Sequence, residues 1–525
     1  MTATTTEAVP PEAAQQGHPR RWLILAVICV AQLTVYLDNT VLNVAIPSLS
    51  SELDADISDI QWMINAYALV LSGMLLTAGS AADRYGRKKM LAIGLALFGL
   101  GSLAAGLSQT ASQLIAARAG MGIGGALLLT TTLAVVVQVF ADAERMKAIS
   151  IWGAVSALGF AVGPLVGGAL LNHFWWGSIF LINLPVSLIG IVFVIKLVPE
   201  SKNPLGERPD VIGAVLSMAG MGSIVFAIIS GPEQGWTSAR TLVAALVGVV
   251  AMVVFIVWER RVPYPMLDMG FFRNQRFVGA VTGALLLAFG MGGSLFLLTQ
   301  HLQFVMGYGP LEAGLRMAPL ALIIVVLNLS GVGPKLLAKL GSAGGVICGM
   351  GLMAVGLTGV ALLGSSYSGL LVALLVLGVG IGLSLPSMAV AIMAAIPPEK
   401  AGMGSGVNST LSEFGNGLGV AVLGAVLTSR LNVLLAGVGV ATLPAVLAGG
   451  GSEAERERAR DAIASGLETS QLVAAAAVLL GGVVASALLH RAERAATAAP
   501  AAATAPVAAA AGTGARADET TKAAV

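Results

Sequence analysis

Long apolar runs dominate this chain and leave few ways in which it can fold. About fourteen segments hold the ~20 consecutive apolar residues that a helix needs to cross a bilayer. Charged residues make up 11% of the 525 residues, whereas ordinary soluble domains contain about 25%. Because lipid cannot hydrogen-bond the backbone, such runs must cross it as helices. The sequence therefore predicts an all-α integral membrane protein. The predicted spans lie near residues 22–44, 59–82, 89–108, 112–137, 148–171, 177–198, 211–230, 241–258, 277–302, 312–332, 343–364, 368–394, 403–430 and 470–490.

Lys and Arg residues are distributed unevenly between the two sides of this predicted bundle. If the N-terminus is placed inside, 22 of the 29 Lys and Arg residues fall in cytoplasmic segments. Because cytoplasmic loops are enriched in Lys and Arg, this bias predicts that both termini lie in the cytoplasm. The first apolar run is too long for a signal peptide and is expected to remain as a span.

The segments outside the spans are short, apart from the two ends of the chain and one loop. Residues 1–19 and 491–525 are rich in Ala, Thr and Pro, which predicts disordered cytoplasmic tails. The one long loop, 431–469, is expected on the outer side. Its stretch "SEAERERARDAIASGLE" predicts a short amphipathic helix that acts as a solvated cap.

Few residues could support catalysis or hold a metal. The two Cys residues fall inside apolar segments, and the four His residues are scattered with no pair at metal-ligand spacing. The chain also lacks the G-x-x-x-x-G-K-[ST] phosphate loop of ATP-driven pumps. We therefore expect a protein that is not an enzyme, with no cofactor, no metal site and no nucleic-acid partner.

One carboxylate, Asp38, interrupts the first apolar span. A charge at the centre of a bilayer costs at least ~2.5–3.5 kcal/mol, so its presence suggests a function. Asp38 is expected ~24 Å from the inner end of its helix, and Arg118 ~9 Å from the outer end of the fourth span. The two would thus lie at comparable depth. Burial favours the protonated carboxyl and a nearby guanidinium favours the carboxylate, so the pair could load and release a proton. A static ion pair that joins two helices is the alternative.

Four motifs resemble those of a known transporter family. Three are "LDNTVLNVAIP" in the first span, "LIAARAGMGIGGA" at 114–126, which contains Arg118, and "GFAVGPLVGG" at 159–168. The fourth is a loop motif after the second span, made of Gly79, Asp83, Arg84, Gly86, Arg87 and Lys88. The loop motif lies between the first span and residues 114–126, so the four motifs follow one another in the order found in the family. Over residues 15–430, the chain resembles the major facilitator superfamily. Within it, the chain is similar to the fourteen-helix drug:proton antiporters of the EmrB/QacA type.

The resemblance implies a fold and a function. The fold is the major facilitator fold, two six-helix bundles plus two extra helices. The bundles are expected at 20–200 and 263–490, and the inserted pair with its linkers at 201–262. The implied function is export of small amphiphilic drugs or antibiotics in exchange for protons, by alternating access. We expect a monomer that lies as a multi-pass protein in the lipid bilayer of a bacterial cytoplasmic membrane.

A weak internal repeat agrees with such a doubled architecture. The loop after the tenth span, "GPKLLAKLGSAG", echoes the loop motif when Gly341 is aligned with Gly86 and Lys339 with Arg84. Repeated halves are common in transporters.

The resemblance also assigns roles to the motif residues. It implies that Asp38 and Arg118 couple transport to protons. The loop motif would be a conformational latch formed by Gly79, Asp83, Arg84, Gly86 and Arg87; positive charge that orients the chain is an alternative reason for its basic residues. The antiporter motif would be a bend that controls exchange, at Gly159, Gly163, Pro164, Gly167 and Gly168. Close helix packing at small residues is compatible with that role.

Polar residues elsewhere in the spans are candidates for contact with substrate. They are Asn43, Asn65, Gln300, Asn408 and Glu413. Glu413 is expected ~15 Å into its span and near the midplane. There it would either attract a cationic drug or serve as a second proton site, and a role in helix packing is the alternative. Asn65 occupies a place where exporters of divalent organic cations carry Asp, which disfavours doubly charged substrates.

The sequence departs from the family pattern at two further positions. Met121 stands where many members have Gln, and Thr130 where Pro is common.

Two other functions agree less well with the sequence. An uptake facilitator for a small nutrient is disfavoured by the antiporter motif. A membrane-embedded enzyme or receptor is disfavoured by the lack of His, Cys and Asp clusters in the spans.

Overall fold

The computed structural model describes residues 18–202, 209–330, 332–396, 401–435 and 452–498, and in these ranges every regular element is a helix. Each predicted span coincides with one of these helices, except 177–198, which divides into a short helix over Ser178–Leu181 and a longer one over Asn183–Leu197. Thirteen helices in the described ranges are long and apolar enough to cross a membrane, and α6 (Asp142–His173) covers the remaining predicted span, 148–171. The prediction of about fourteen spanning helices is thereby confirmed.

The first bundle consists of the helices from the N-terminal part of the chain. They are α1 (Arg21–Val44), the short α2 (Ile46–Glu52), α3 (Ile57–Tyr85), α4 (Arg87–Gly106), α5 (Ala111–Val139), α6, α7 (Ser178–Leu181) and α8 (Asn183–Leu197). Within it α5 packs on α3 and α4, and α1 packs on α6 and α8. Side-chain caps begin several of these helices, since Asp56 accepts from the Asp59 amide at 2.7 Å and Thr110 from the Gln113 amide at 3.3 Å.

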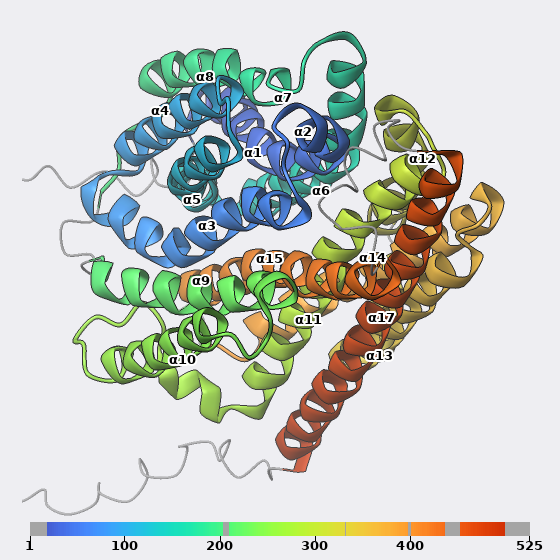
Figure 1. Cartoon of the computed structure of the whole chain (residues 1–525). Coiled ribbons are helices and arrows are strands. Elements are labelled where there is room, and N and C mark those ends of the chain that lie inside the picture. Colours follow the sequence, from blue (N-terminus) through green and yellow to red (C-terminus); the bar gives the residue numbers. More distant parts are fainter. Residues whose placement is uncertain (1–17, 203–208, 331, 397–400, 436–451, 499–525) are drawn as a thin grey trace, which may run out of the picture.

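The second bundle repeats this arrangement with the later helices. They are α11 (Gln275–Gln300), which continues as η2 (His301–Val305), α12 (Pro310–Leu329), α13 (Val332–Leu363), α14 (Tyr367–Met393), α15 (Ala401–Leu434) and α17 (Glu453–Ala498); η1 (Met269–Arg273) precedes them. Here α13 packs on α14 and α17, and α11 on α15 and α17. The two bundles meet along α3 with α15 and along α6 with α12 (Figure 1).

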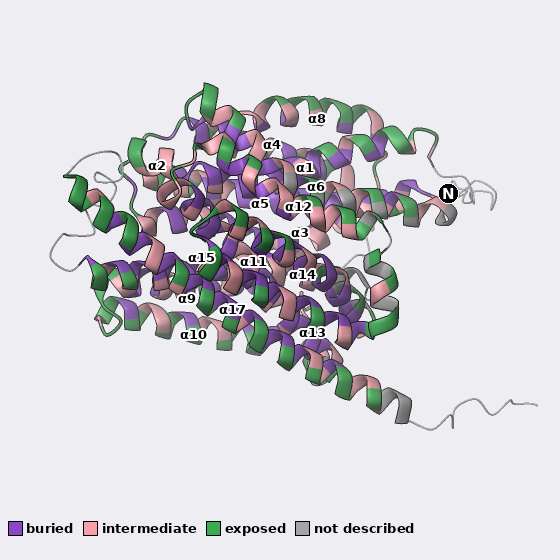
Figure 2. Cartoon of the chain, turned by 90° about the vertical axis from the view of Figure 1, so that its right-hand side faces the viewer, coloured by how far each residue is buried: buried purple, intermediate pink, exposed green. Residues whose placement is uncertain are grey.

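The two helices between the bundles form a hairpin of their own. They are α9 (Val211–Gln234) and α10 (Ala239–Glu259), which pack on each other, while α9 also contacts α3 and α15 (Figure 1). The outward side of α10 is apolar and exposed, with Leu246 63% and Val243 58% exposed. Exposed residues also follow α8 on the opposite side of the molecule (Figure 2). Large exposed apolar surfaces of this kind suit contact with lipid.

The two ends of the helix bundle carry different elements. The end that carries α2 is called the α2 face. The opposite end, which carries the turn between α3 and α4 at residues 83–89, is called the motif face. Gly86 makes that turn possible, because its φ of 115° is one that a residue with a Cβ rarely adopts. Gly341, its counterpart in the repeat, also has a positive φ of 69°, which agrees with the alignment of the two loops.

The structure differs from the sequence-based expectation at the C-terminal end. The expected outer loop 431–469 is shorter, because α15 continues to Leu434 and α17 already begins at Glu453. The charged stretch is not a separate short helix but the start of α17. A capping box begins it: the Ser452 hydroxyl accepts from the Glu455 amide at 3.3 Å, and Glu455 accepts from the Ser452 amide at 2.7 Å. The helix then runs to Ala498, into the expected tail.

The predicted tails and the outer loop fall largely on residues 1–17, 436–451 and 499–525, which lie outside the described residues.

Candidate functional site

Asp38 and Arg118 meet inside the first bundle. Nη1 of Arg118 donates to Oδ2 of Asp38, and Nε of Arg118 donates to the carbonyl oxygen of Met63 at 3.1 Å. Asp38 is 2% and Arg118 1% exposed. Removing either partner would leave a buried charge without compensation. The structure thus brings together the two residues that the sequence proposed as a pair.

Asn183 is a further partner of Asp38 that the sequence did not reveal. Its Nδ2 donates to Oδ1 of Asp38 at 3.3 Å and to the hydroxyl of Ser102 at 3.3 Å. Asn183 is 1% exposed and begins α8. The one available signal was an amide in the apolar run "FLINLP", which does not tell whether it faces a neighbouring helix or lipid. The carboxylate therefore has a donor on each oxygen.

Tyr67 covers the other side of the Arg118 guanidinium. The guanidinium carbon lies 4.3 Å from the centroid of the Tyr67 ring, within range of a cation–π interaction. The Tyr67 hydroxyl is buried and no donor or acceptor among the described residues reaches it. The ion pair is therefore held by α1, α3, α5 and α8 together.

The antiporter motif on α6 contacts the opposite side of α1. The Thr40 hydroxyl bonds the Leu37 carbonyl at 3.1 Å and also reaches the Gly159 carbonyl at 3.5 Å. A Cβ added at Gly163 would collide with the Thr40 side chain, and one at Gly167 would lie 2.9 Å from Val41. The glycines of this motif therefore allow α6 to lie directly against α1.

The same motif also touches the second bundle. A Cβ added at Gly168 would lie 2.7 Å from the Pro310 carbonyl oxygen of α12. In return, Gly314 of α12 packs against the backbone of Pro164. These contacts lie toward the α2 face, where Nε2 of Gln303 also donates to the Val44 carbonyl at 3.2 Å. The antiporter motif is thus part of the joint between the bundles.

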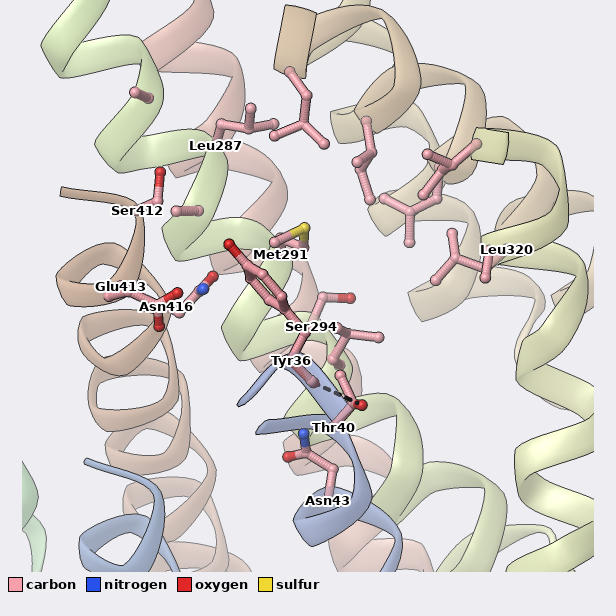
Figure 3. Close-up of a pocket in the computed structure, with 18 of the residues that line it drawn as sticks. Tyr36, Thr40, Asn43, Leu287, Met291, Ser294, Leu320, Ser412, Glu413 and Asn416 are labelled. Atoms are coloured by element: carbon pink, nitrogen blue, oxygen red, sulfur yellow. Dashed lines mark hydrogen bonds between the residues drawn. The ribbon is translucent and has the colours of Figure 1, made fainter. Parts of the chain in front are cut away.

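A cavity of about 310 Å³ lies between the two bundles. Helices α1, α5, α6, α11, α12, α14 and α15 line it, mostly with Leu, Ile, Ala and Met side chains. Its polar lining residues are Tyr36, Thr40, Asn43, Ser294, Asn408, Ser409, Ser412, Glu413 and Asn416. In Figure 3, Ser412, Glu413 and Asn416 lie together on α15, and Tyr36 reaches from α1 toward Met291. A mostly apolar cavity with a few polar groups is typical of a small-molecule site.

Three side chains of the cavity lining offer hydrogen-bond acceptors to a ligand. The side-chain oxygens of Asn43 and Asn416 are buried, and no donor among the described residues reaches them. Glu413 is 6% exposed, and no described Lys or Arg forms an ion pair with it. A ligand with N–H groups or a positive charge would complement this lining.

The five predicted substrate contacts divide into three groups. Asn43, Asn408 and Glu413 line the central cavity. Asn65 does not; it is fully buried between α3 and α15, where its Oδ1 would lie 2.7 Å from a Cβ added at Gly417. Gln300 lies in a second cavity at the α2 face. Tyr36, Thr40 and the serines of α15 are lining residues that the sequence did not single out, because their direction depends on how the helices pack.

The loop motif forms a compact cluster at the motif face. Nε and Nη2 of Arg87 donate to Oδ1 of Asp83 at 2.9 and 2.7 Å, and Nη1 of Arg87 donates to the Ala134 carbonyl at 3.4 Å. Glu200, which follows α8, accepts from the Lys88 amide at 3.1 Å. Gly79 faces Thr130 of α5, while Arg84 lies on the last turn of α3. All these contacts lie within the first bundle.

The described part of the chain contains no group of three or more His, Cys, Asp or Glu side chains that could hold a metal ion. The arrangement can instead hold one proton-accepting carboxylate and one small molecule at separate places. The carboxylate lies within the first bundle, and the molecule would lie between the bundles.

Comparison with protein families and with sequence relatives gives a consistent result. The family model described as Major Facilitator Superfamily matches residues 28–211 and 203–420. The multidrug efflux pump LfrA of Mycolicibacterium smegmatis is 35% identical over 436 residues, which cover 82% of this chain and 86% of that protein. The methyl viologen resistance protein SmvA of Salmonella typhimurium is 36% identical over 419 residues, covering 78% and 83%. The tetracenomycin C resistance and export protein of Streptomyces glaucescens is 32% identical over 426 residues, covering 80% and 78%.

A solved structure has a similar fold. It is the crystal structure of a bacterial homolog of the human lysosomal transporter Spinster, in an inward-facing and unoccupied conformation. The two match with a TM-score of 0.66 and 19% sequence identity, over 90% of this chain and 98% of that chain. At this identity the similarity concerns the fold alone.

Proposed function

The chain belongs to the Major Facilitator Superfamily, and from this premise we propose that it exports amphiphilic drugs or antibiotics from a bacterial cell in exchange for protons. It is a transporter and not an enzyme. The names of the multidrug and antibiotic efflux relatives support export over uptake of a nutrient. The direction of transport and the coupling ion then follow from the site.

The observation that carries the proposal is the position of Asp38 relative to the central cavity. Asp38 is buried against Arg118 and Asn183, while Thr40, two residues later on the same helix, lines the cavity. A proton on Asp38 removes its charge and weakens its attraction to Arg118. The resulting shift of α1 changes the cavity wall and the contact with the antiporter motif of α6. Proton binding at Asp38 and drug binding in the central cavity are thereby coupled although they occur at separate sites.

The direction of access follows from the joint between the bundles. The bias of Lys and Arg supports a cytoplasmic motif face and an outer α2 face. Toward the α2 face the bundles touch, at Gly168 with α12 and at Gln303 with Val44. A joint closed on that side corresponds to a transporter whose cavity faces the cytoplasm. The bundles at 20–200 and 263–490 rock about this joint, and the pair at 201–262 accompanies them.

The cavity lining supports the substrate class. Its apolar walls suit the hydrophobic part of an amphiphile, and the acceptors at Asn43, Asn416 and Glu413 suit an amine. Apolar residues exposed on α8 and α10 place the transporter in the lipid bilayer as a multi-pass protein. We include in the proposal that both termini are cytoplasmic and that one chain is sufficient for transport.

Everted membrane vesicles test the function directly. Vesicles that contain the protein should accumulate a fluorescent drug when respiration acidifies their interior, and added drug should release protons from that interior. Asp38→Asn should abolish both effects, because an amide cannot carry the proton, while drug binding to the purified protein persists. Asp54→Asn, at an exposed position outside the site, is the matched control. Normal proton-coupled accumulation by Asp38→Asn would refute the proposal.

A further inference from the structure

A second cavity of about 710 Å³ lies at the α2 face, separate from the central one. Segments of both bundles and the end of α9 line it. Its lining includes Asp56, Glu233, Gln300, Gln303, Tyr308 and Asn432. We call it the α2-face vestibule. Its volume is sufficient for a drug-sized molecule.

The amide side chains of the vestibule leave their oxygens as acceptors. Nε2 of Gln300 donates to the Phe296 carbonyl at 3.3 Å, and Nε2 of Gln303 to the Val44 carbonyl at 3.2 Å. Nδ2 of Asn432 donates to the Pro232 carbonyl at 3.0 Å. In each amide one N–H group bonds a backbone carbonyl, so the side-chain carbonyl oxygen and the second N–H group remain for a ligand.

The charges of the lining have one sign. Asp56 and Glu233 carry carboxylates, and none of the described lining residues is Lys, Arg or His. One basic group near the lining is Arg316, whose guanidinium carbon lies 3.9 Å from the centroid of the Tyr308 ring. Arg316 is already paired with Glu312 at 2.7 Å, so it adds little net positive charge. The field in the vestibule therefore attracts cations.

Apart from three serines and Thr428, the remaining lining is mostly apolar and partly aromatic. Phe296 and Phe304 come from α11 and η2, and Leu427 and Ile463 from α15 and α17. A hydrated metal ion makes no favourable contact with apolar side chains. An organic cation has an apolar body that can pack on them and a charge that the carboxylates attract. Aromatic faces also attract cations that lack strong hydration.

We propose that the α2-face vestibule is a second binding site, for monovalent organic cations that are leaving the central cavity. The inference rests on the proposed export function, which places this face on the release side. The hydrogen bond between Gln303 and Val44 and the contact of Gly168 with α12 separate the two cavities. When this joint opens, a cation passes from Glu413 to Glu233. The inserted hairpin thereby gains a role, because Glu233 belongs to α9.

Equilibrium binding to the purified full-length chain tests this. The probe is tetraphenylphosphonium, and the wild type should bind two per chain. In the double variant Asp56→Asn/Glu233→Gln, the affinity for tetraphenylphosphonium at one of the two sites should fall about five- to tenfold, because two attractions between a carboxylate and the cation are lost. Asn is itself a good N-cap, so the start of α3 should be preserved. Unchanged binding of the probe in the central cavity would show that the double variant is folded. If the double variant is unfolded, Glu233→Gln alone decides the test, because Glu233 is exposed.

The matched control is Glu52→Gln, which removes the same charge from the same face at a residue outside the vestibule. It should leave both affinities unchanged. One probe per wild-type chain, or two unchanged sites in the double variant, would overturn the inference. Because binding is measured without a gradient, the result is independent of transport. Vesicles that fail to export would refute the proposed function and leave the vestibule standing as a cation site.

Discussion

Asp38 and Thr40 lie two residues apart on α1 and point in opposite directions. Asp38 faces Arg118 and Asn183 inside the first bundle, whereas Thr40 faces α6 and the central cavity. Residues two apart on a helix are separated by about 200°, so one helix can present both faces at the same level. Under the proposed function, α1 is therefore the helix that would transmit the charge state of Asp38 to the central cavity.

Arg118→Ala should reduce stability and export more than Arg118→Lys does. Arg118→Ala leaves Asp38 buried without its partner, a change that costs about 3–5 kcal/mol for buried pairs. Arg118→Lys keeps the charge but loses the fork that reaches both Asp38 and the Met63 carbonyl. We expect no proton-coupled export from the Ala variant and partial export from the Lys variant. Thermal unfolding and vesicle transport measure the two effects, and full activity of Arg118→Ala would contradict the pairing.

Asn183 should act as a positioning residue for Asp38. A hydrogen bond to a charged group contributes about 1.5–3 kcal/mol, so Asn183→Leu should slow proton-coupled export about tenfold or more. Binding of drug to the purified protein should change little, because Asn183 is not a residue of the cavity lining. The pH dependence of transport should change as well, which a merely structural role would not cause. An unchanged pH profile together with a uniform loss of folded protein would assign Asn183 to packing.

The number and order of the spans could be predicted from the sequence because they depend on local properties. Apolar length determines a span, and the turn at Gly86 depends on the freedom of one residue. The start of α17 differs from the expectation of a separate short helix. Its charged residues lower the hydropathy and end the apolar run, but Ala, Glu and Arg are strong helix formers, so one helix continues through both segments.

The direction of side chains could be predicted only in part. Asp38 and Arg118 were found because a lone charge in a span needs a partner. Asn65 and Asn183 are equally polar, but one is buried against Gly417 and the other serves Asp38. Which helix lies opposite an amide depends on tertiary packing, which a single sequence does not reveal.

The close contact between Gly163 and Thr40 should not tolerate a methyl group. Gly163→Ala forces α6 away from α1, and overpacking of this kind costs about 1–3 kcal/mol. We expect lower thermal stability and a larger loss of export, with partial recovery when Thr40→Ala is added. The control is Gly120→Ala on α5, where an added Cβ meets nothing within 4 Å. Equal behaviour of the two single variants would contradict a role for the contact between α6 and α1 in export.

The Asp83–Arg87 pair should influence the rate of cycling more than stability. It is partly exposed at the motif face, and such pairs contribute about 0–1 kcal/mol to folding. Asp83→Asn should therefore unfold at nearly the wild-type temperature and bind drug normally, yet export it several-fold more slowly. Stopped-flow transport with equilibrium binding on the same preparation separates the two steps. Weakened binding at an unchanged rate would contradict the assignment of a latch.

Glu413 should determine which substrates the central cavity prefers. It is the one carboxylate among the described lining residues, and no described Lys or Arg pairs with it. A monovalent organic cation can supply the missing charge, whereas a neutral amphiphile uses the apolar walls and the amide oxygens of Asn43 and Asn416. The interaction is strong because a charge in this setting is poorly screened by water.

Glu413→Gln keeps the shape and the polarity of the side chain but removes its charge. We expect export of a cation such as ethidium to fall about tenfold or more, since one charge–charge contact is worth at least ~1.4 kcal/mol at low dielectric. Export of a neutral amphiphile should stay within about twofold, which also shows that the variant is folded. Resistance of cells to one drug of each kind, followed by vesicle transport, measures the difference. If the Gln variant exports both substrates as well as the wild type does, Glu413 is a protonated helix-packing residue, for which Gln is a fair substitute.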